Sequence, residues 1–313
     1  MDRLIFLFSI LFLSGQIVVA TEFTTKLALN WKAEPEFGGF FEGNEKGIYK
    51  KNGFNLEILE GGSGTPTVQM LMSGQIEYAI LSSEEIILNN DRDPKRKLVA
   101  VFAVFESSPY MIMSHAKQNY QNLKQVFQTN GSTISLQKGL PYVDYLLHKF
   151  GPVKAEIVPY SGGITSFEKN SKLAQQGFLT SEFLLAQGKD LDPKAWLVSD
   201  EGFNPYIAVL AVREEFLIKN RNQVAKMVEA TREGWNSYLS APDQTNQAMH
   251  KLNPSMSNDM MGKSLKQMTK LMKFEPQKLG QMKKQRWQTL SQQMMDLKLI
   301  SKPIESDKIF QDF

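Results

Sequence analysis

Residues 54–81 of the chain read FNLEILEGGSGTPTVQMLMSGQIEYAIL. Apolar and polar side chains alternate in the opening segment, which is typical of a half-buried strand. A glycine-rich turn follows, and then Thr65 and Pro66 suit the N-cap and the first position of a helix. This helix should end near Gly74, and residues 76–81 form an apolar run that predicts another strand. The stretch therefore predicts a strand–helix–strand unit, the building block of parallel sheets.

The alternation of strands and helices continues on both sides of this stretch. Residues 26–31 predict a strand before it, and residues 98–105 predict a strand after it. Residues 132–198 repeat the alternation, which indicates a second α/β domain, and the C-terminal part of the chain is mainly helical. We place the two crossings between the domains near residues 106 and 202.

Helices are predicted between the strands. Residues 37–51 and 164–175 are expected to be helical, and residues 82–85 (SSEE) have the polar and acidic character of a helix start. Methionines recur at helical spacing over residues 256–272, and we interpret this stripe as helical core rather than as a metal- or peptide-binding face.

The composition restricts the functions that the chain can have. It has 313 residues, with 36 Lys+Arg against 33 Asp+Glu and a net charge of +3. This nearly balanced charge does not favour nucleic-acid binding. The sequence contains no cysteine, so disulfides, thiol catalysis, cysteine-ligated metals and a lipid anchor on an N-terminal cysteine are excluded.

The first residues have the features of a secretory signal peptide. Arg3 precedes an apolar run at residues 4–13, and residues 18–20 (VVA) are of the kind that a signal peptidase recognises. A membrane span needs about twenty apolar residues, so this run is too short to be an anchor. We expect cleavage after Ala20 and a periplasmic mature protein without a lipid anchor.

Three loops follow the carboxyl ends of successive predicted strands, at residues 31–37, 61–65 and 82–83. Ligands of open α/β sheets collect at this edge. The loops supply an aromatic wall, backbone donors and hydroxyl groups, which suit a small, flat, polar ligand. No P-loop is present, and the three histidines show neither metal-ligand spacing nor a nucleophile partner. The sequence therefore predicts binding rather than catalysis, with no metal and no cofactor.

Several of these segments resemble one family. Residues 31–41 (WKAEPEFGGFF) and 45–58 (EKGIYKKNGFNLEI) look like the opening of the SsuA/THI5-like (NMT1) solute-binding proteins. The resemblance continues through residues 61–85. It is taken up again at residues 178–182 (FLTSE), which are similar to the family's T-x-E-P segment, although Phe183 replaces the proline.

The resemblance implies a type II periplasmic-binding fold: two Rossmann-like lobes joined by a two-crossover hinge, with a helical C-terminal segment. Lobe I would comprise residues 21–105 and 206–313, and lobe II residues 106–205. Members of the family deliver thiamine pyrimidine precursors, riboflavin, sulfonates or nitrate to ABC transporters. The implied partner is therefore an ABC transporter permease, and we expect the binding protein itself to be a monomer.

The resemblance also implies a ligand site between the lobes. Its residues would be Trp31, Phe37, Gly62, Ser63, Gly64, Thr65, Ser82, Ser83, Tyr110, Glu182 and Tyr206. The aromatic side chains would stack on the ligand, the glycine turn and the hydroxyl groups would donate hydrogen bonds, and Glu182 would accept one or pair with a ligand amine. No arginine occurs in the matched loops, so a neutral or cationic heteroaromatic ligand, similar to a thiamine pyrimidine precursor, is favoured over a sulfonate.

Alternatives remain open at this point. Trp31 could be a core residue, the glycine turn a purely structural connection, and Glu182 a helix-terminal carboxylate stabilised by the helix dipole. The same fold could serve a sensor that feeds a membrane signalling partner, or bind riboflavin, a sulfonate or nitrate. A pyrimidine synthase is disfavoured, because relatives with that activity contain a reactive histidine and a cysteine-rich motif that this sequence lacks.

Overall fold

The computed structural model describes residues 23–273 and 275–313. The predicted signal peptide, residues 1–20, lies outside the described residues. Within them, no helix is both long and apolar enough to cross a membrane.

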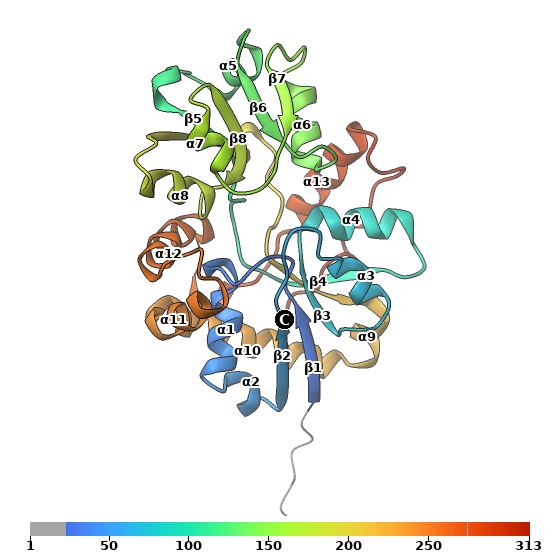
Figure 1. The fold of residues 1–313 in the computed structure, drawn as a ribbon. Coiled ribbons are helices and arrows are strands. Elements are labelled where there is room, and N and C mark those ends of the chain that lie inside the picture. Colours follow the sequence, from blue (N-terminus) through green and yellow to red (C-terminus); the bar gives the residue numbers. More distant parts are fainter. Residues whose placement is uncertain (1–22, 274) are drawn as a thin grey trace, which may run out of the picture.

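Two five-stranded sheets form two α/β lobes, one above the other in Figure 1. The first sheet has the order β2-β1-β3-β10-β4. Its strands are β1 (Phe23–Ala28), β2 (Phe54–Leu59), β3 (Tyr78–Leu81), β4 (Leu98–Ala103) and β10 (Val209–Arg213). The second sheet has the order β7-β6-β8-β5-β9. Its strands are β5 (Tyr110–His115), β6 (Thr133–Leu136), β7 (Glu156–Pro159), β8 (Leu173–Phe178) and β9 (Pro193–Leu197).

Each sheet is mainly parallel with one strand running against its neighbours. In the first sheet β1 pairs in parallel with β2 and β3, so that Leu27 lies opposite Ile58 and Tyr78. Strand β10 returns from the second lobe and is antiparallel to both β3 and β4. In the second sheet β5 takes the same position, antiparallel to β8 and β9. The first strand after each crossover therefore enters its sheet in the reverse direction.

Helices cover both faces of the first sheet. The helices of the first lobe are α1 (Gly38–Glu45), α2 (Ile48–Lys51), α3 (Thr67–Met72), α4 (Ser83–Arg92), α9 (Glu214–Lys219), α10 (Arg221–Ser240), α11 (Asp243–Leu252), α12 (Asn258–Met272) and α13 (Lys284–Asp296). Those of the second lobe are α5 (Leu123–Gln128), α6 (Pro141–Lys149), α7 (Thr165–Lys169) and α8 (Glu182–Gly188). Helices α1, α10 and α12 share one apolar core with the sheet, and α3, α4 and α13 share the other.

The methionine stripe belongs to the first of these cores. Met261 and Met268 are fully buried against it, and Met256 and Met272 are nearly so. Because these side chains pack into a continuous apolar cluster, the core interpretation of the stripe is confirmed.

Four local predictions differ from the structure. The strand predicted over residues 26–31 is β1, which lies three residues earlier. The helix predicted over residues 37–51 breaks into α1 and α2 at Gly47, whose φ of +66° interrupts helical geometry. The helix predicted over residues 164–175 ends at Lys169; a turn follows, and β8 begins at Leu173. Thr65 does not cap α3, because its hydroxyl instead accepts a hydrogen bond of 2.8 Å from the N–H of Gly62 and closes the glycine turn.

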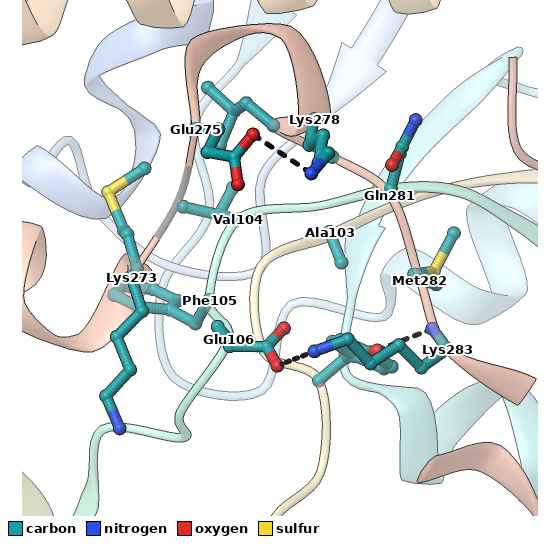
Figure 2. A pocket seen from close by; sticks show the side chains of 14 residues that line it. Ala103, Val104, Phe105, Glu106, Lys273, Glu275, Lys278, Gln281, Met282 and Lys283 are labelled. Carbon is teal, nitrogen blue, oxygen red and sulfur yellow. Dashed lines mark hydrogen bonds and ion pairs between the residues drawn. The ribbon is translucent and has the colours of Figure 1, made fainter. Parts of the chain in front are cut away.

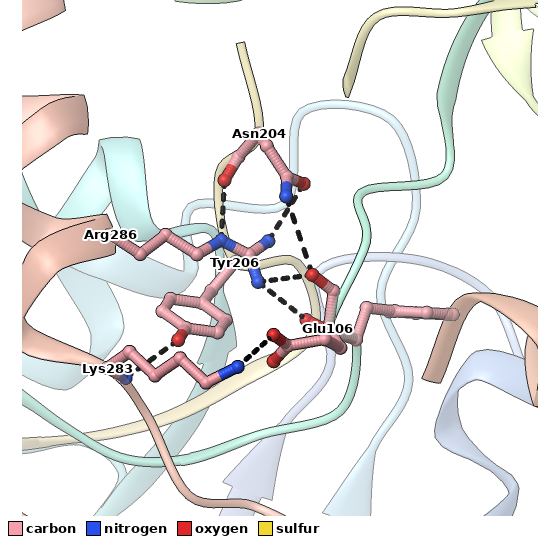
Figure 3. A network of polar contacts seen from close by, with 6 residues as sticks. Glu106, Asn204, Tyr206, Lys283 and Arg286 are labelled. Atoms are coloured by element: carbon pink, nitrogen blue, oxygen red, sulfur yellow. Dashed lines mark hydrogen bonds and ion pairs between the residues drawn. The ribbon is translucent and has the colours of Figure 1, made fainter. Parts of the chain in front are cut away.

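The two crossovers, residues 104–109 and 198–208, are tied together by α13 (Figure 3). The Arg286 guanidinium donates to the carbonyl of Glu106 at 2.6 Å and to those of Asn204 and Pro205, both at 2.6 Å. It also lies 3.7 Å from the centre of the Tyr206 ring. One side chain of the first lobe thus holds both connections to the second.

Candidate functional site

A cavity of about 210 Å³ lies between the two lobes. The first lobe contributes the loop after β1, and the second lobe contributes the ends of β6, β7 and β8 and the starts of α6 and α8. Its apolar and aromatic lining consists of Trp31, Tyr110, Leu140, Tyr142, Tyr160 and Phe178. Its polar lining consists of Asn30, Glu34, Glu36, Gln137, Gln176, Ser181 and Glu182. The cavity therefore combines aromatic faces with three carboxyl groups.

The aromatic residues of the cavity support one another. The rings of Tyr110 and Tyr142 stack with their centres 4.2 Å apart, and Phe178 meets Tyr110 edge-on at 5.3 Å. Such pairs are worth about 1 kcal/mol beyond the area they bury. The three rings therefore form a preorganised wall on the side of the second lobe.

A glycine fixes the loop that carries Trp31. The N–H of Gly61 donates to the Trp31 carbonyl at 3.0 Å. A Cβ at this position would lie 2.2 Å from the Leu29 carbonyl oxygen, so no larger residue fits. The Trp31 indole N–H in turn donates to Glu34 at 3.2 Å. The glycine turn thus positions the tryptophan through close backbone approach.

Glu182 is held by its own lobe. Its carboxylate accepts hydrogen bonds from the Tyr160 hydroxyl at 3.0 Å and from the backbone N–H of Phe178 at 2.8 Å. A Cβ on Gly177 would lie 2.9 Å from the Cβ of Glu182, so this glycine makes room for the carboxylate to fold back. The N-terminal position on α8 also favours negative charge, although α8 is short.

The carboxyl groups of the first lobe are harder to ionise than usual. Burial raises the pKa of Glu34 to about 7, and the Glu182 carboxylate adds to this shift. Burial also holds the pKa of Glu36 well above its usual range, with further contributions from Glu34 and Glu182. Among the described residues, no lysine or arginine lines the cavity, and the charge of the exposed Lys32 offsets only part of the shift at Glu34. Where these groups are ionised, the site is therefore electrostatically unfavourable for an anion.

The structure brings three of the predicted site residues to this cavity: Trp31, Tyr110 and Glu182. Phe37 does not line it, because the short 3₁₀ helix Pro35–Phe37 turns its ring into the core of the first lobe, where it is fully buried. Ser63 and Gly64 are exposed at the tip of their turn, and Thr65 lines a separate hollow with α4. Gly62 is half-buried in the same turn and donates to Thr65.

The remaining predicted residues are engaged within the protein and do not line the cavity. Ser82 caps α4, with its hydroxyl accepting from the Glu85 N–H at 3.3 Å and the Glu85 carboxylate accepting from the Ser82 N–H at 2.7 Å. The Ser83 hydroxyl accepts from the Tyr206 N–H at 2.9 Å. Tyr206 is buried in the hinge, beside Arg286. These groups therefore stabilise the framework around the site.

Several residues that line the cavity were not predicted from the sequence. Glu34 and Glu36 flank Pro35 in the loop that carries Trp31, and two acids beside an aromatic residue at a strand end were a usable signal. Tyr142 and Tyr160 come from the second lobe, where no motif marks them. Only the tertiary contacts between the lobes reveal that they share one site.

A larger cavity, of about 410 Å³, lies between the first crossover and residues 272–273 and 275–283 (Figure 2). Two of its lysines are already paired: Lys278 with Glu275 at 2.9 Å, and Lys283 with Glu106 at 2.5 Å. Its lining belongs to the first lobe and the hinge alone. It therefore lacks the contribution from both lobes that marks the inter-lobe cavity.

Two α/β lobes with a double crossover and a cavity between them define the class of two-lobed binding-protein folds. The profile of the NMT1/THI5 like family matches residues 34–245. The chain belongs to this family, and the resemblance stated from the sequence is confirmed. Comparison with curated protein sequences finds no match.

Solved structures agree with the type II periplasmic-binding fold. The periplasmic aliphatic sulphonate binding protein SsuA from Escherichia coli has 12% identity and a TM-score of 0.69, covering 92% of both chains. SsuA from Xanthomonas axonopodis pv. citri, bound to MOPS, has 10% identity and a TM-score of 0.69, covering 94% of this chain and 100% of that one. The periplasmic nitrate-binding protein NrtA from Synechocystis PCC 6803 has 12% identity and a TM-score of 0.66, covering 92% and 86%. At these identities the likeness establishes the fold alone, which confirms the predicted fold class.

Proposed function

We propose that the chain is the exported solute-binding component of an ABC importer, and that it captures a small heteroaromatic ligand between its lobes in the periplasm. The observation that carries this proposal is the inter-lobe cavity, which Trp31 of one lobe lines together with the stacked Tyr110 and Tyr142 of the other. A ligand enclosed by both lobes favours the closed state, and hinge closure is how two-lobed binding proteins respond to ligand. Family membership supports the same role.

The composition of the cavity favours a thiamine pyrimidine precursor or a related amine over an anion. The similar solved proteins are named for sulphonate and nitrate binding. An anionic ligand here would meet Glu34, Glu36 and Glu182 with no lining lysine or arginine to pair with it. Like charges at short range in a poorly solvated site repel strongly. The chemistry therefore supports a neutral or cationic aromatic ligand.

Binding without catalysis fits the same site. The chain has no cysteine, and no histidine lines the cavity. The Ser181 hydroxyl hydrogen-bonds Glu34, but no histidine joins this pair as it does in serine–histidine sites. We therefore propose that the ligand leaves unchanged and passes to a membrane permease.

The test is thermal unfolding of residues 21–313 with thiamine, its aminopyrimidine precursors, riboflavin, taurine, an alkanesulfonate and nitrate. A ligand at about 100 times its Kd should stabilise the protein by roughly 2.7 kcal/mol and raise its Tm. Trp31→Ala should abolish the shift. Trp196→Ala is the matched control, because Trp196 is half-buried on β9 and does not line the cavity. A shift with taurine or nitrate alone would contradict the proposed ligand class.

A further inference from the structure

Glu36 is a buried acid without a partner. Its side chain lines the inter-lobe cavity, only 7% of the residue is exposed, and its carboxylate accepts no hydrogen bond from any described residue. A buried carboxylate left in this state costs free energy, and such groups are normally paired. The Oδ1 atom of Asn30, which lines the same cavity, is also buried without a hydrogen-bond partner. One buried unsatisfied acceptor, Asn30 Oδ1, and one carboxyl group without a hydrogen bond therefore face one small space.

Two further carboxyl groups face this space from opposite lobes. Glu34 lies on the first lobe and Glu182 on the second, and each uses part of its capacity on its own lobe, through Trp31 and Tyr160 respectively. Lys32, next in the chain to Trp31, is exposed and does not line the cavity. When the lobes close without a cation between them, the acids of the first lobe approach Glu182 of the second lobe, and like charges repel.

The aromatic lining, like the acids, favours a positively charged ligand. The faces of tryptophan and tyrosine attract cations at up to about 6 Å, and this attraction strengthens where water is excluded. Trp31, Tyr110, Tyr142 and Tyr160 line the cavity together with the acids. Aromatic rings combined with carboxylates form a site for an organic cation.

We propose that the ligand carries a positive charge, which Glu34 and Glu36 of the first lobe share with Glu182 of the second. This inference rests on the proposed function of the same cavity and narrows its ligand class to small aromatic ammonium, amidinium or N-alkylated heteroaromatic cations. The positive charge of the ligand would then stabilise the closed state, because the acids of both lobes attract the ligand instead of repelling one another.

The test compares charged and neutral compounds at pH 8 by calorimetric titration. Thiamine, whose thiazolium ring is permanently charged, and benzyltrimethylammonium are the cationic probes. The neutral probes are 4-amino-5-hydroxymethyl-2-methylpyrimidine and benzyl alcohol. We expect at least one cation to bind tenfold or more tightly than both neutral compounds. Glu36→Gln should weaken that binding at least tenfold, whereas Glu60→Gln, at an exposed acid outside the cavity, should leave it unchanged.

A second readout needs no ligand. Glu36→Gln should raise the Tm of the free protein at pH 8. The acid is ionised in the unfolded chain at this pH and its burial raises its pKa, so folding costs free energy that a neutral side chain of the same shape avoids. A lower Tm would mean that the carboxylate is satisfied in the free protein, and would overturn the inference.

The ligand experiments separate this inference from the proposed function. Tight binding of the neutral pyrimidine that survives Glu36→Gln but not Trp31→Ala would overturn the cation site and leave the binding role intact. Absence of binding by both cations would also overturn the cation site.

Discussion

Glu34 sits where the two lobes meet, and its environment controls its charge. Its side chain receives a hydrogen bond from Trp31, yet burial and the Glu182 carboxylate together raise its pKa to about 7. In the unfolded chain an ordinary glutamate titrates near pH 4.3. Between these values the folded protein holds a proton on Glu34 that the unfolded chain has released. The ionised form is therefore the less stable one in the folded state.

We expect the stability of the ligand-free protein to fall as the pH rises from about 4.5 to 7, because a raised pKa stabilises the fold only while the group stays protonated. Glu34→Gln should reduce this loss by up to a few kcal/mol. Urea unfolding at intervals from pH 4.5 to 8 measures the effect. The free energy of unfolding of this variant should still fall somewhat with pH, because the pKa of Glu84 is also raised, to about 8. An unchanged slope in Glu34→Gln would show that Glu34 ionises normally.

At the scale of single elements, α4 begins with a reciprocal pair of hydrogen bonds. The Ser82 hydroxyl accepts from the Glu85 N–H, and the Glu85 carboxylate accepts from the Ser82 N–H. The helix start that the SSEE sequence predicted is confirmed. The Ser82 hydroxyl only accepts in this pair and keeps its own O–H to donate, but Ser82 does not line the inter-lobe cavity.

Replacing Ser82 separates its role as a cap from its predicted role as a ligand donor. We expect Ser82→Ala to lower the free energy of unfolding by about 1 kcal/mol, the usual cost of losing an N-cap, and Ser82→Asp to restore most of it. Urea denaturation measures the stability, and titration with the ligand found above measures the Kd. An unchanged Kd in Ser82→Ala would assign the serine to the cap, and a Kd raised tenfold would assign it to the ligand.

At the scale of the whole molecule, the two crossovers act as one hinge because Arg286 joins them. Its guanidinium donates to carbonyl groups of both connections and packs on the Tyr206 ring (Figure 3). Lys283, from the segment just before α13, pairs with Glu106 on the first crossover at 2.5 Å. The C-terminal segment therefore contributes to the connection between lobes as well as to the core of the first lobe.

Arg286→Lys should destabilise the protein although it keeps the charge. A lysine ammonium cannot reproduce the planar set of donors that reaches both crossovers, and hydrogen bonds from charged groups are worth about 1.5–3 kcal/mol each. We expect a loss of at least about 2 kcal/mol in urea unfolding. Arg96→Lys is the matched control, because Arg96 forms an exposed pair with Asp93, and such pairs contribute little. Equal stability of the two variants would contradict the conclusion that Arg286 joins the two crossovers.

The sequence by itself determined the features that depend on neighbouring residues. Period-two alternation located β2, and it indicated β1 with bounds three residues too late. The SSEE sequence located the start of α4, and residues 31–41 carried the resemblance that the family match confirms. The local pattern was wrong where it was ambiguous. Residues 173–175 were predicted as helix but belong to β8, because pairing with β5 and β6 outweighs their local preference.

Only the tertiary structure decided which side chains meet in the site. In one short loop, Phe37 turns into the core while Glu34 and Glu36 face the cavity, and packing against α12 and the sheet sets that direction rather than sequence spacing. Tyr142 and Tyr160 reach the same cavity from the other lobe. The charge of the site likewise depends on distances between segments far apart in the chain, which no local pattern encodes.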